Sequence, residues 1–213
     1  RLGSTVHANL KLSSGELALV QCSEPAESAL IADACAGLRV PSSGAVRFMG
    51  KDWSQLAPAA RSRRRARIGR VFSRGNWLEH LSVADNILLP SLYHTRTPMR
   101  ELRAQTLALA RSFALPGLPT GQPFAQPRSD LQRAACVRAL LGSPSLIVLE
   151  EPTEHVYPEA LAPLVNELRT LRDKGAAVLW LALDRRVWQD RSIPVDRRFR
   201  LFGRALTELG SRR

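Results

Sequence analysis

The sequence contains few of the features that mark secreted or membrane-embedded proteins. Its three cysteines, at positions 22, 35 and 136, are odd in number and lack CxxC spacing. This usage favours buried, reduced thiols in a cytosolic compartment. Apolar runs such as residues 176–183 are far too short to cross a bilayer, so we expect any membrane role to be peripheral. No charged-then-apolar leader opens the sequence, and nothing in it suggests secretion.

Lysine is also scarce, although the chain is strongly basic. Lys11, Lys51 and Lys174 are the only lysines among 31 basic residues, and the formal net charge is +12. Such a surface suits nucleic acid, anionic lipid headgroups or an acidic protein, but an arginine-favouring genome would give the same composition. The 213 residues can bury a substantial core, as one domain or one domain with a subdomain.

Short apolar runs alternate with helical patterns, which predicts an α/β fold. We expect strands near residues 10–12, 17–20, 45–49, 68–72, 146–149, 177–183, 195–202 and 205–209. We expect helices near residues 27–38, 78–90 (ending at Pro90), 99–114 and 130–141, another from Pro158, and a short one after residue 183. Three successive helices suggest a helical subdomain at 74–142, inserted in a core formed by 1–73 and 143–213.

The most informative stretch is residues 145–158. An unbroken apolar run from Leu146 to Leu149 fits a strand buried on both faces, although periodicity alone leaves a buried helix open. Glu150 and Glu151 follow at the carboxyl end of that run, where open parallel sheets place their ligands. The two acids mark either an acidic exit from the strand or the magnesium-and-water end of a nucleotide site.

Several short patterns in connecting sequence add to this stretch. They are Gly15 with Glu16, Gly37 with Gly44, Gly69 with Phe72, Leu81 with Asn86, Gln132 with Arg133, and Pro152 with Pro158. Because of the order and spacing of these patterns, the chain resembles the nucleotide-binding subunit of an ABC transporter over essentially its whole length. The resemblance implies a P-loop NTPase-like ABC ATPase fold with a mostly parallel central sheet, an N-terminal antiparallel β portion and an inserted α-helical subdomain.

The phosphate loop implied by the resemblance is degenerate. Its positions are Ser23, Glu24, Glu27, Ser28 and Ala29. The family has a glycine-rich turn ending in Gly-Lys-Ser or Gly-Lys-Thr, whereas here Glu27 takes the lysine position and Pro25 removes a backbone N–H. A carboxylate about 4 Å from one phosphate charge costs roughly 1 kcal/mol in water and nearer 4 at an effective dielectric constant of about 20. Ser28 keeps the magnesium-ligand position, but it could equally be a helix N-cap.

The remaining motif positions are altered as well. The resemblance puts Glu150 at the Walker B aspartate and retains Glu151 as the general-base glutamate. Ser73 replaces the glutamine that follows the Val-Phe strand, and Leu183 replaces the switch histidine. The signature motif has lost its glycines and has Pro127, Arg128 and Ser129 at its centre.

These losses together argue against ATP hydrolysis by the usual route of the family. The prediction is a pseudo-ATPase that needs no cofactor. ATP with magnesium, bound by Ser28 and Glu150, is expected only if the chain is an active but atypical ATPase.

The resemblance also implies partners and a location. They are a membrane permease that docks through a coupling helix, and a second ABC ATPase subunit or a copy of the chain itself, at the cytoplasmic face of the bacterial inner membrane. The local sequence is most similar to subunits of lipid-transport and lipoprotein-release systems. The expected docking surface consists of Ser73, Trp77, Leu78, Leu81, Val83, Asn86 and Ile87.

Six arginines lie between Arg61 and Arg70. They form either a solvated helix face ahead of a core strand or a contact with an acidic partner or inner-leaflet lipid headgroups. A nucleic-acid-binding protein on the same scaffold is less supported, because no aromatic residues interleave with these arginines.

Overall fold

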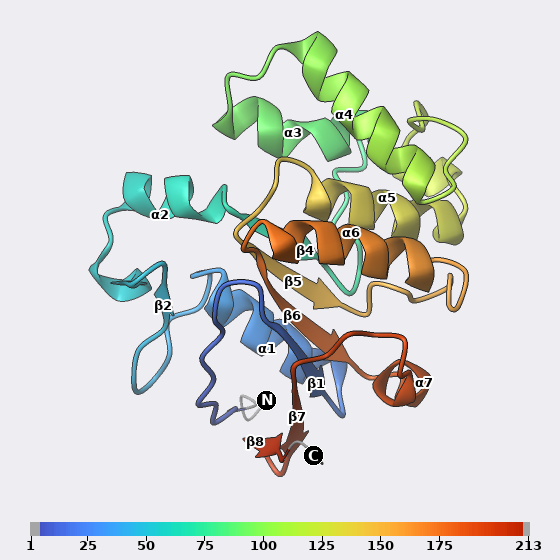
Figure 1. Cartoon of the computed structure of the whole chain (residues 1–213). Helices are drawn as coiled ribbons and strands as arrows, with labels where there is room; N and C mark the ends of the chain where they lie inside the picture. The colour runs from blue at the N-terminus through green and yellow to red at the C-terminus, as the bar shows by residue number, and fades with distance from the viewer. Residues whose placement is uncertain (1–4, 211–213) are drawn as a thin grey trace.

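The fold is built on a six-stranded, mostly parallel sheet (Figure 1). The computed structural model describes residues 5–210. The strand order is β4-β5-β6-β1-β7-β8. Five strands run parallel, and β8 pairs antiparallel with β7 at one edge. The strands are β1 (Leu17–Gln21), β4 (Ile68–Val71), β5 (Leu146–Glu150), β6 (Ala177–Ala182), β7 (Arg197–Phe202) and β8 (Ala205–Leu209). The predicted α/β class and the strand predicted at 146–149 are confirmed.

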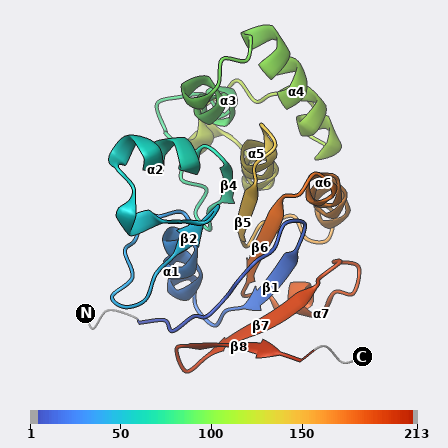
Figure 2. The same cartoon turned by 60° about the vertical axis from the view of Figure 1, so that its left-hand side comes forward.

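Helices cover both faces of this sheet, which explains why its central strands are continuous apolar runs. Alternate residues of β1 enter two different core clusters: Leu17 and Leu19 enter one, and Ala18 and Val20 enter the other. Helices α5 (Arg128–Leu140) and α6 (Leu161–Asp173) contribute to the first cluster, and α1 (Pro25–Cys35) contributes to the second. Figure 2 shows α1 and α6 on opposite sides of the strands.

A layer of helices stands above the β4 edge of the sheet (Figure 1). It contains α3 (Val83–His94), α4 (Met99–Ser112) and α5, which contact one another. The expected end of α3 at Pro90 is wrong, because the helix continues to His94. Pro90 removes one backbone hydrogen bond, but buried Ile87, Leu88 and Ser91 on either side anchor the helix. The division into a core and a subdomain at 74–142 stays a prediction.

The N-terminal antiparallel portion is small. It consists of a hairpin of β2 (Arg47–Phe48) and β3 (Lys51–Asp52). No strand forms at residues 10–12 within the described range 5–210. Leu10 and Leu12 instead pack against the second core cluster, and an isolated bridge joins His7 to Ala205.

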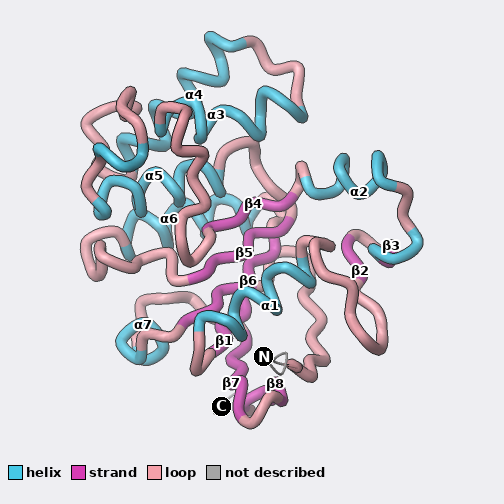
Figure 3. The backbone as a smooth tube through the Cα atoms, turned by 180° about the vertical axis from the view of Figure 1, so that it is seen from behind, coloured by secondary structure: helices cyan, strands magenta, loops and turns pink. Residues whose placement is uncertain are grey.

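Short helices complete the described chain, whose path is seen from behind in Figure 3. They are η1 (Trp53–Gln55), α2 (Pro58–Arg65), η2 (Pro123–Ala125) and α7 (Arg185–Gln189). Helix α6 begins at Leu161 rather than at Pro158, because turns occupy the intervening residues. Between residues 5 and 210, no helix combines the length and the apolarity that a membrane crossing requires.

Candidate functional site

The phosphate-loop positions form the turn between β1 and α1. Glu24 is the N-cap residue of α1 and Pro25 is its first helical residue. The carboxylate of Glu27 folds back and accepts the backbone N–H groups of Ser23 at 2.9 Å and Glu24 at 3.1 Å. A glutamate at the third position of a helix commonly satisfies free N–H donors in this way, and its charge suits the positive helix end. Two backbone donors of the loop, those of Ser23 and Glu24, are therefore bonded to the Glu27 side chain.

Ser28 is not the helix N-cap, and that interpretation is wrong. It lies one turn inside α1, fully buried, and its hydroxyl donates to the carbonyl of Pro25 at 2.9 Å. Serine in this geometry bonds its own helix. The neighbouring Ala29 brings no polar side chain to the loop.

The Walker B position, Glu150, is held in a buried ion-pair network. Its side chain is 1% exposed at the end of β5, and its Oε1 accepts a hydrogen bond of 2.7 Å from Nε of Arg70. The same guanidinium donates from Nη1 to Asp33 of α1 at 2.7 Å. Burial raises the pKa of Glu150, and the adjacent arginine opposes that rise. Arg70 thus supplies the positive charge that a buried carboxylate requires.

Glu151, at the general-base position, has a side chain that accepts a backbone hydrogen bond. Its backbone φ of 47° lies in the left-handed region, which non-glycine residues seldom adopt. Its carboxylate accepts the backbone N–H of Leu183, the residue at the switch-histidine position, and its carbonyl accepts from Nε2 of Gln132 at 3.1 Å. Burial raises the pKa of the Glu151 carboxyl, and its effect is larger than that of the neighbouring charges.

Three predicted site acids converge near Cys22, at the exit of β1. Burial is the main cause that raises the pKa of this thiol to about 12, and the charges of Glu27, Glu151 and Glu150 add to it. The loop and the strand end are therefore close together. The surroundings carry negative groups where a triphosphate would need positive ones.

Ser73 and the residues predicted to dock a partner are only partly at the surface. Val83, Asn86 and Ile87 are buried, so they support the surface without reaching a partner. The side chain of Asn86 bonds the backbone N–H of Leu78 at 2.8 Å and the carbonyls of Leu78 and Ser82. Trp77 is partly buried, Ser73 and Leu81 are partly exposed, and Leu78 is 43% exposed.

The three signature positions lie at the start of α5. Pro127 is the N-cap residue of that helix, and Arg128 and Ser129 follow it. Pro127 and Arg128 are exposed and Ser129 is partly exposed. Proline offers no N–H at this helix start, so one backbone donor is missing where the family presents glycines to a partner subunit.

The sequence analysis did not identify Arg70 and Asp33 as site residues. Arg70 was grouped with the solvated arginines, yet it is one of the buried residues of β4. The available signal was its position between Gly69 and Val71 in an apolar strand. A cation there must find a buried partner.

Solved structures with this arrangement of elements are transporter cassettes. The dimeric structure of MJ0796, a bacterial ABC transporter cassette, matches 97% of this chain and 91% of its own chain, with a TM-score of 0.83 and 22% identity. A post-hydrolysis state of MJ0796 bound to ADP and Pi matches with a TM-score of 0.84 and 21% identity, over 99% of this chain and 91% of that one. The fold is therefore that of an ABC ATPase cassette.

Sequence relatives then define the family, although no protein-family model matches the chain. The lipoprotein-releasing system ATP-binding protein LolD of Pseudomonas fluorescens is 34% identical over 166 residues, which are 76% of this chain and 72% of LolD. The macrolide export ATP-binding/permease protein MacB of Salmonella typhimurium is 31% identical over 179 residues, or 83% of this chain. The chain spans only 27% of MacB. It belongs to the ABC transporter ATP-binding protein family, as the resemblance implied.

Proposed function

We propose that the chain is a non-catalytic ABC subunit that serves a membrane transporter as a scaffold or regulator. Its partners would be a permease and an active ATPase paralogue, at the cytoplasmic face of a bacterial inner membrane. One observation carries the proposal: protein side chains occupy both charged ends of the nucleotide site. Glu27 engages the loop donors, and Arg70 engages the carboxylate of Glu150.

At the phosphate end, ATP would have to displace a carboxylate that is part of the loop. Glu27 also places a negative charge where the family has a lysine. One such charge about 4 Å from one phosphate charge costs roughly 1 to 4 kcal/mol, depending on how well solvent screens it. Because Glu27 is partly exposed, the lower end of this range applies.

At the metal end, Glu150 would have to release Arg70 before it could bind magnesium. Mg²⁺ is held by oxygen ligands in near-octahedral geometry, and here Oε1 is 2.7 Å from a guanidinium nitrogen. A divalent cation at that carboxylate would also be repelled by the arginine. These residues therefore do not fit ATP with magnesium, and no catalytic step through them follows.

A transporter role is supported by the groove that remains between the sheet and the helical layer. It has a volume of about 190 Å³. Its apolar and basic lining comes from the segment after α1, from α2, β4, α3 and α5, and from Phe72 after β4. Its lining residues are Ala36, Leu38, Arg65, Ile68, Gly69, Arg70, Phe72, Pro90 and Arg138. None of the seven predicted docking residues lines it, so a permease segment seated here would contact their neighbours Phe72 and Pro90.

Nucleotide binding tests the proposal directly. We expect a fluorescent ATP analogue with magnesium to show no saturable binding to the purified chain below millimolar concentration. Glu27→Gln should raise the affinity for pyrophosphate about fivefold or more, because it removes a charge from the phosphate path. Glu24→Gln is the matched control, since it removes a charge from the same loop while the Glu27 carboxylate stays in place. Micromolar binding of ATP to the unchanged chain would overturn the proposal.

One feature favours an active but atypical ATPase. Burial raises the pKa of Glu151, and general bases commonly have such shifts. Co-purification from membranes would show whether a permease and a second ATPase accompany the chain. In that complex, Glu151→Gln should leave ATP hydrolysis unchanged, whereas a large drop would restore Glu151 as the base.

A further inference from the structure

Helix α2 is an unusual surface element. Four of its eight residues are arginines, and none of its residues is buried. A helix without a buried apolar face gains little free energy from packing against the core. Its charges are also close together, so they repel one another unless anions offset them.

The structure divides the six arginines between residues 61 and 70 into two groups. Arg65 donates to the carbonyls of Ala36 and Gly37, Arg67 donates to the hydroxyl of Ser145, and Arg70 is buried in its ion pairs. These three guanidinium groups hold the fold together. The other three are Arg61, Arg63 and Arg64.

The second group has no anionic partner. No carboxylate of residues 5–210 forms an ion pair with Arg61, Arg63 or Arg64. Arg61 makes one long hydrogen bond, of 3.4 Å, to the carbonyl of Ser54. The Nε atoms of Arg61 and Arg64 are buried and lack a hydrogen-bond partner. Asp52 lines the same pocket as Arg61, but its carboxylate accepts from Ser54.

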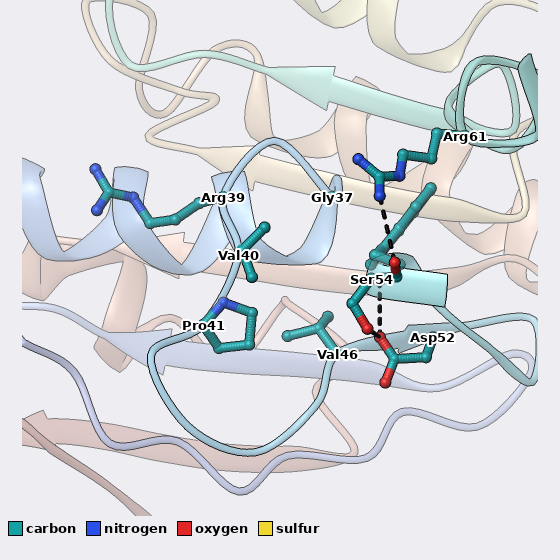
Figure 4. A pocket seen from close by; sticks show the side chains of 9 residues that line it. Gly37, Arg39, Val40, Pro41, Val46, Asp52, Ser54 and Arg61 are labelled. Atoms are coloured by element: carbon teal, nitrogen blue, oxygen red, sulfur yellow. Dashed lines mark hydrogen bonds between the residues drawn. The ribbon is translucent and has the colours of Figure 1, made fainter. Parts of the chain in front are cut away.

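Exposed apolar side chains lie near helix α2. Val40 is 71% exposed and lines a pocket with Arg61 (Figure 4). Leu38 is 55% exposed and lines the larger groove with Arg65 of α2. A surface that combines unpaired cations with exposed apolar side chains can bind both an anionic headgroup and the apolar boundary beneath it.

We propose that Arg61, Arg63, Arg64, Leu38 and Val40, together called the α2 face, bind the anionic headgroup layer of a lipid bilayer. Guanidinium groups bind phosphate oxygens in a bidentate manner. Val40 lines the pocket beside Arg61, so an apolar side chain and a guanidinium group share that part of the surface. Leu38, Val40 and Arg63 are exposed, and Arg61 and Arg64 are partly exposed. A fluid headgroup layer can adapt to such an uneven surface.

Vesicle binding by the purified chain tests the proposal. We expect the chain to co-sediment with phosphatidylcholine vesicles that contain about a third phosphatidylglycerol, and not with vesicles of phosphatidylcholine alone. Each basic residue near an anionic membrane contributes about fivefold to binding. The triple variant R61Q/R63Q/R64Q should therefore lower the partition coefficient on the order of 100-fold. L38S/V40S should weaken the binding that remains in high salt, where electrostatic attraction is screened.

The matched control is R100Q/R103Q/R111Q, which removes the same charge from exposed positions of α4. We expect it to lower the partition coefficient less than about threefold, because charges beyond a Debye length are largely screened. Unchanged circular dichroism would show that both triple variants fold.

Equal losses in the two triple variants would overturn the proposal, because net charge and not the α2 face would then determine binding. Failure to bind anionic vesicles would also overturn it, as would tighter binding of duplex DNA than of vesicles. The inference goes beyond the proposed function: nucleotide binding tests the loop, and vesicle binding tests a separate face.

Discussion

Replacing Arg70 with methionine removes the positive charge that, among residues 5–210, contacts Glu150. The two side chains are 7% and 1% exposed, and their nitrogen and oxygen are 2.7 Å apart. Loss of one partner from a buried pair typically costs roughly 3 to 5 kcal/mol, because the other charge remains buried. Asp33 adds little to this cost, since its side chain is 37% exposed and can be hydrated. We therefore expect Arg70→Met to lose roughly 3 to 5 kcal/mol of unfolding free energy at neutral pH.

The pH dependence of this loss follows from the carboxyl group. Burial already raises the pKa of Glu150, and without Arg70 that rise is unopposed. A folded-state pKa above the unfolded value of about 4.3 means that the folded chain binds more protons. The stability of Arg70→Met should therefore fall as pH rises from about 4.3 through the folded-state pKa. Urea unfolding followed by circular dichroism at pH 5 and pH 8 measures the difference, and the deficit should be smaller at pH 5.

A double-mutant cycle provides the control. Glu150→Gln removes the buried charge, so adding it to Arg70→Met should restore most of the lost stability. A loss below about 1 kcal/mol in the single variant would refute the argument. So would a double variant no more stable than Arg70→Met.

Three further predictions concern packing, a buried amide and thiol chemistry. A Cβ at Gly69 would lie 1.8 Å from the carbonyl oxygen of Ala139. Gly69→Ala should therefore lower the unfolding free energy, measured in urea, by at least about 1 to 3 kcal/mol. Its control is Gly117→Ala, which places a Cβ in open space and should change stability little. Asn86→Ala should lower the unfolding free energy by about 1 kcal/mol or more, because it removes the partner of the Leu78 backbone N–H and the side-chain donor to the carbonyls of Leu78 and Ser82. Asn76→Ala, at an exposed position, is its control. Burial raises the pKa of all three thiols to about 11 or 12. A disulfide reagent at pH 8 should therefore react slowly with the folded chain and label three thiols quickly in denaturant. Rapid labelling of the folded chain would contradict this burial.

The apolar pattern of the sequence predicted the sheet well, for a physical reason. Strands β5 and β6 are covered on both faces, so their residues are apolar without interruption, and a run of that kind is visible without a structure. The stretch at residues 10–12 also alternates, but its leucines pack against the core from outside the sheet. Alternation of apolar and polar residues indicates that one side of a segment is buried. A segment can be buried in this way without pairing as a strand.

The sequence suggested which residues form a candidate site, and it did not reveal their contacts. The resemblance brought Glu27, Glu150 and Glu151 together from distant parts of the chain, and all three influence the same thiol. The pairing of Glu150 with Arg70 depends on which face of β4 the arginine occupies, and that is set by the register of Arg70 with Val148. The direction in which Glu27 folds back depends on where α1 begins, and one-residue differences there change its partners.

The contacts of Arg70 also have a mechanical meaning. They tie helix α1, through Asp33, to the ends of strands β4 and β5, so these elements are fastened together before any ligand arrives. In this chain the contacts form without a ligand. Under the proposed function, they would hold the surface offered to a partner in one arrangement. The subunit would then keep one conformation while the active ATPase paralogue changes conformation.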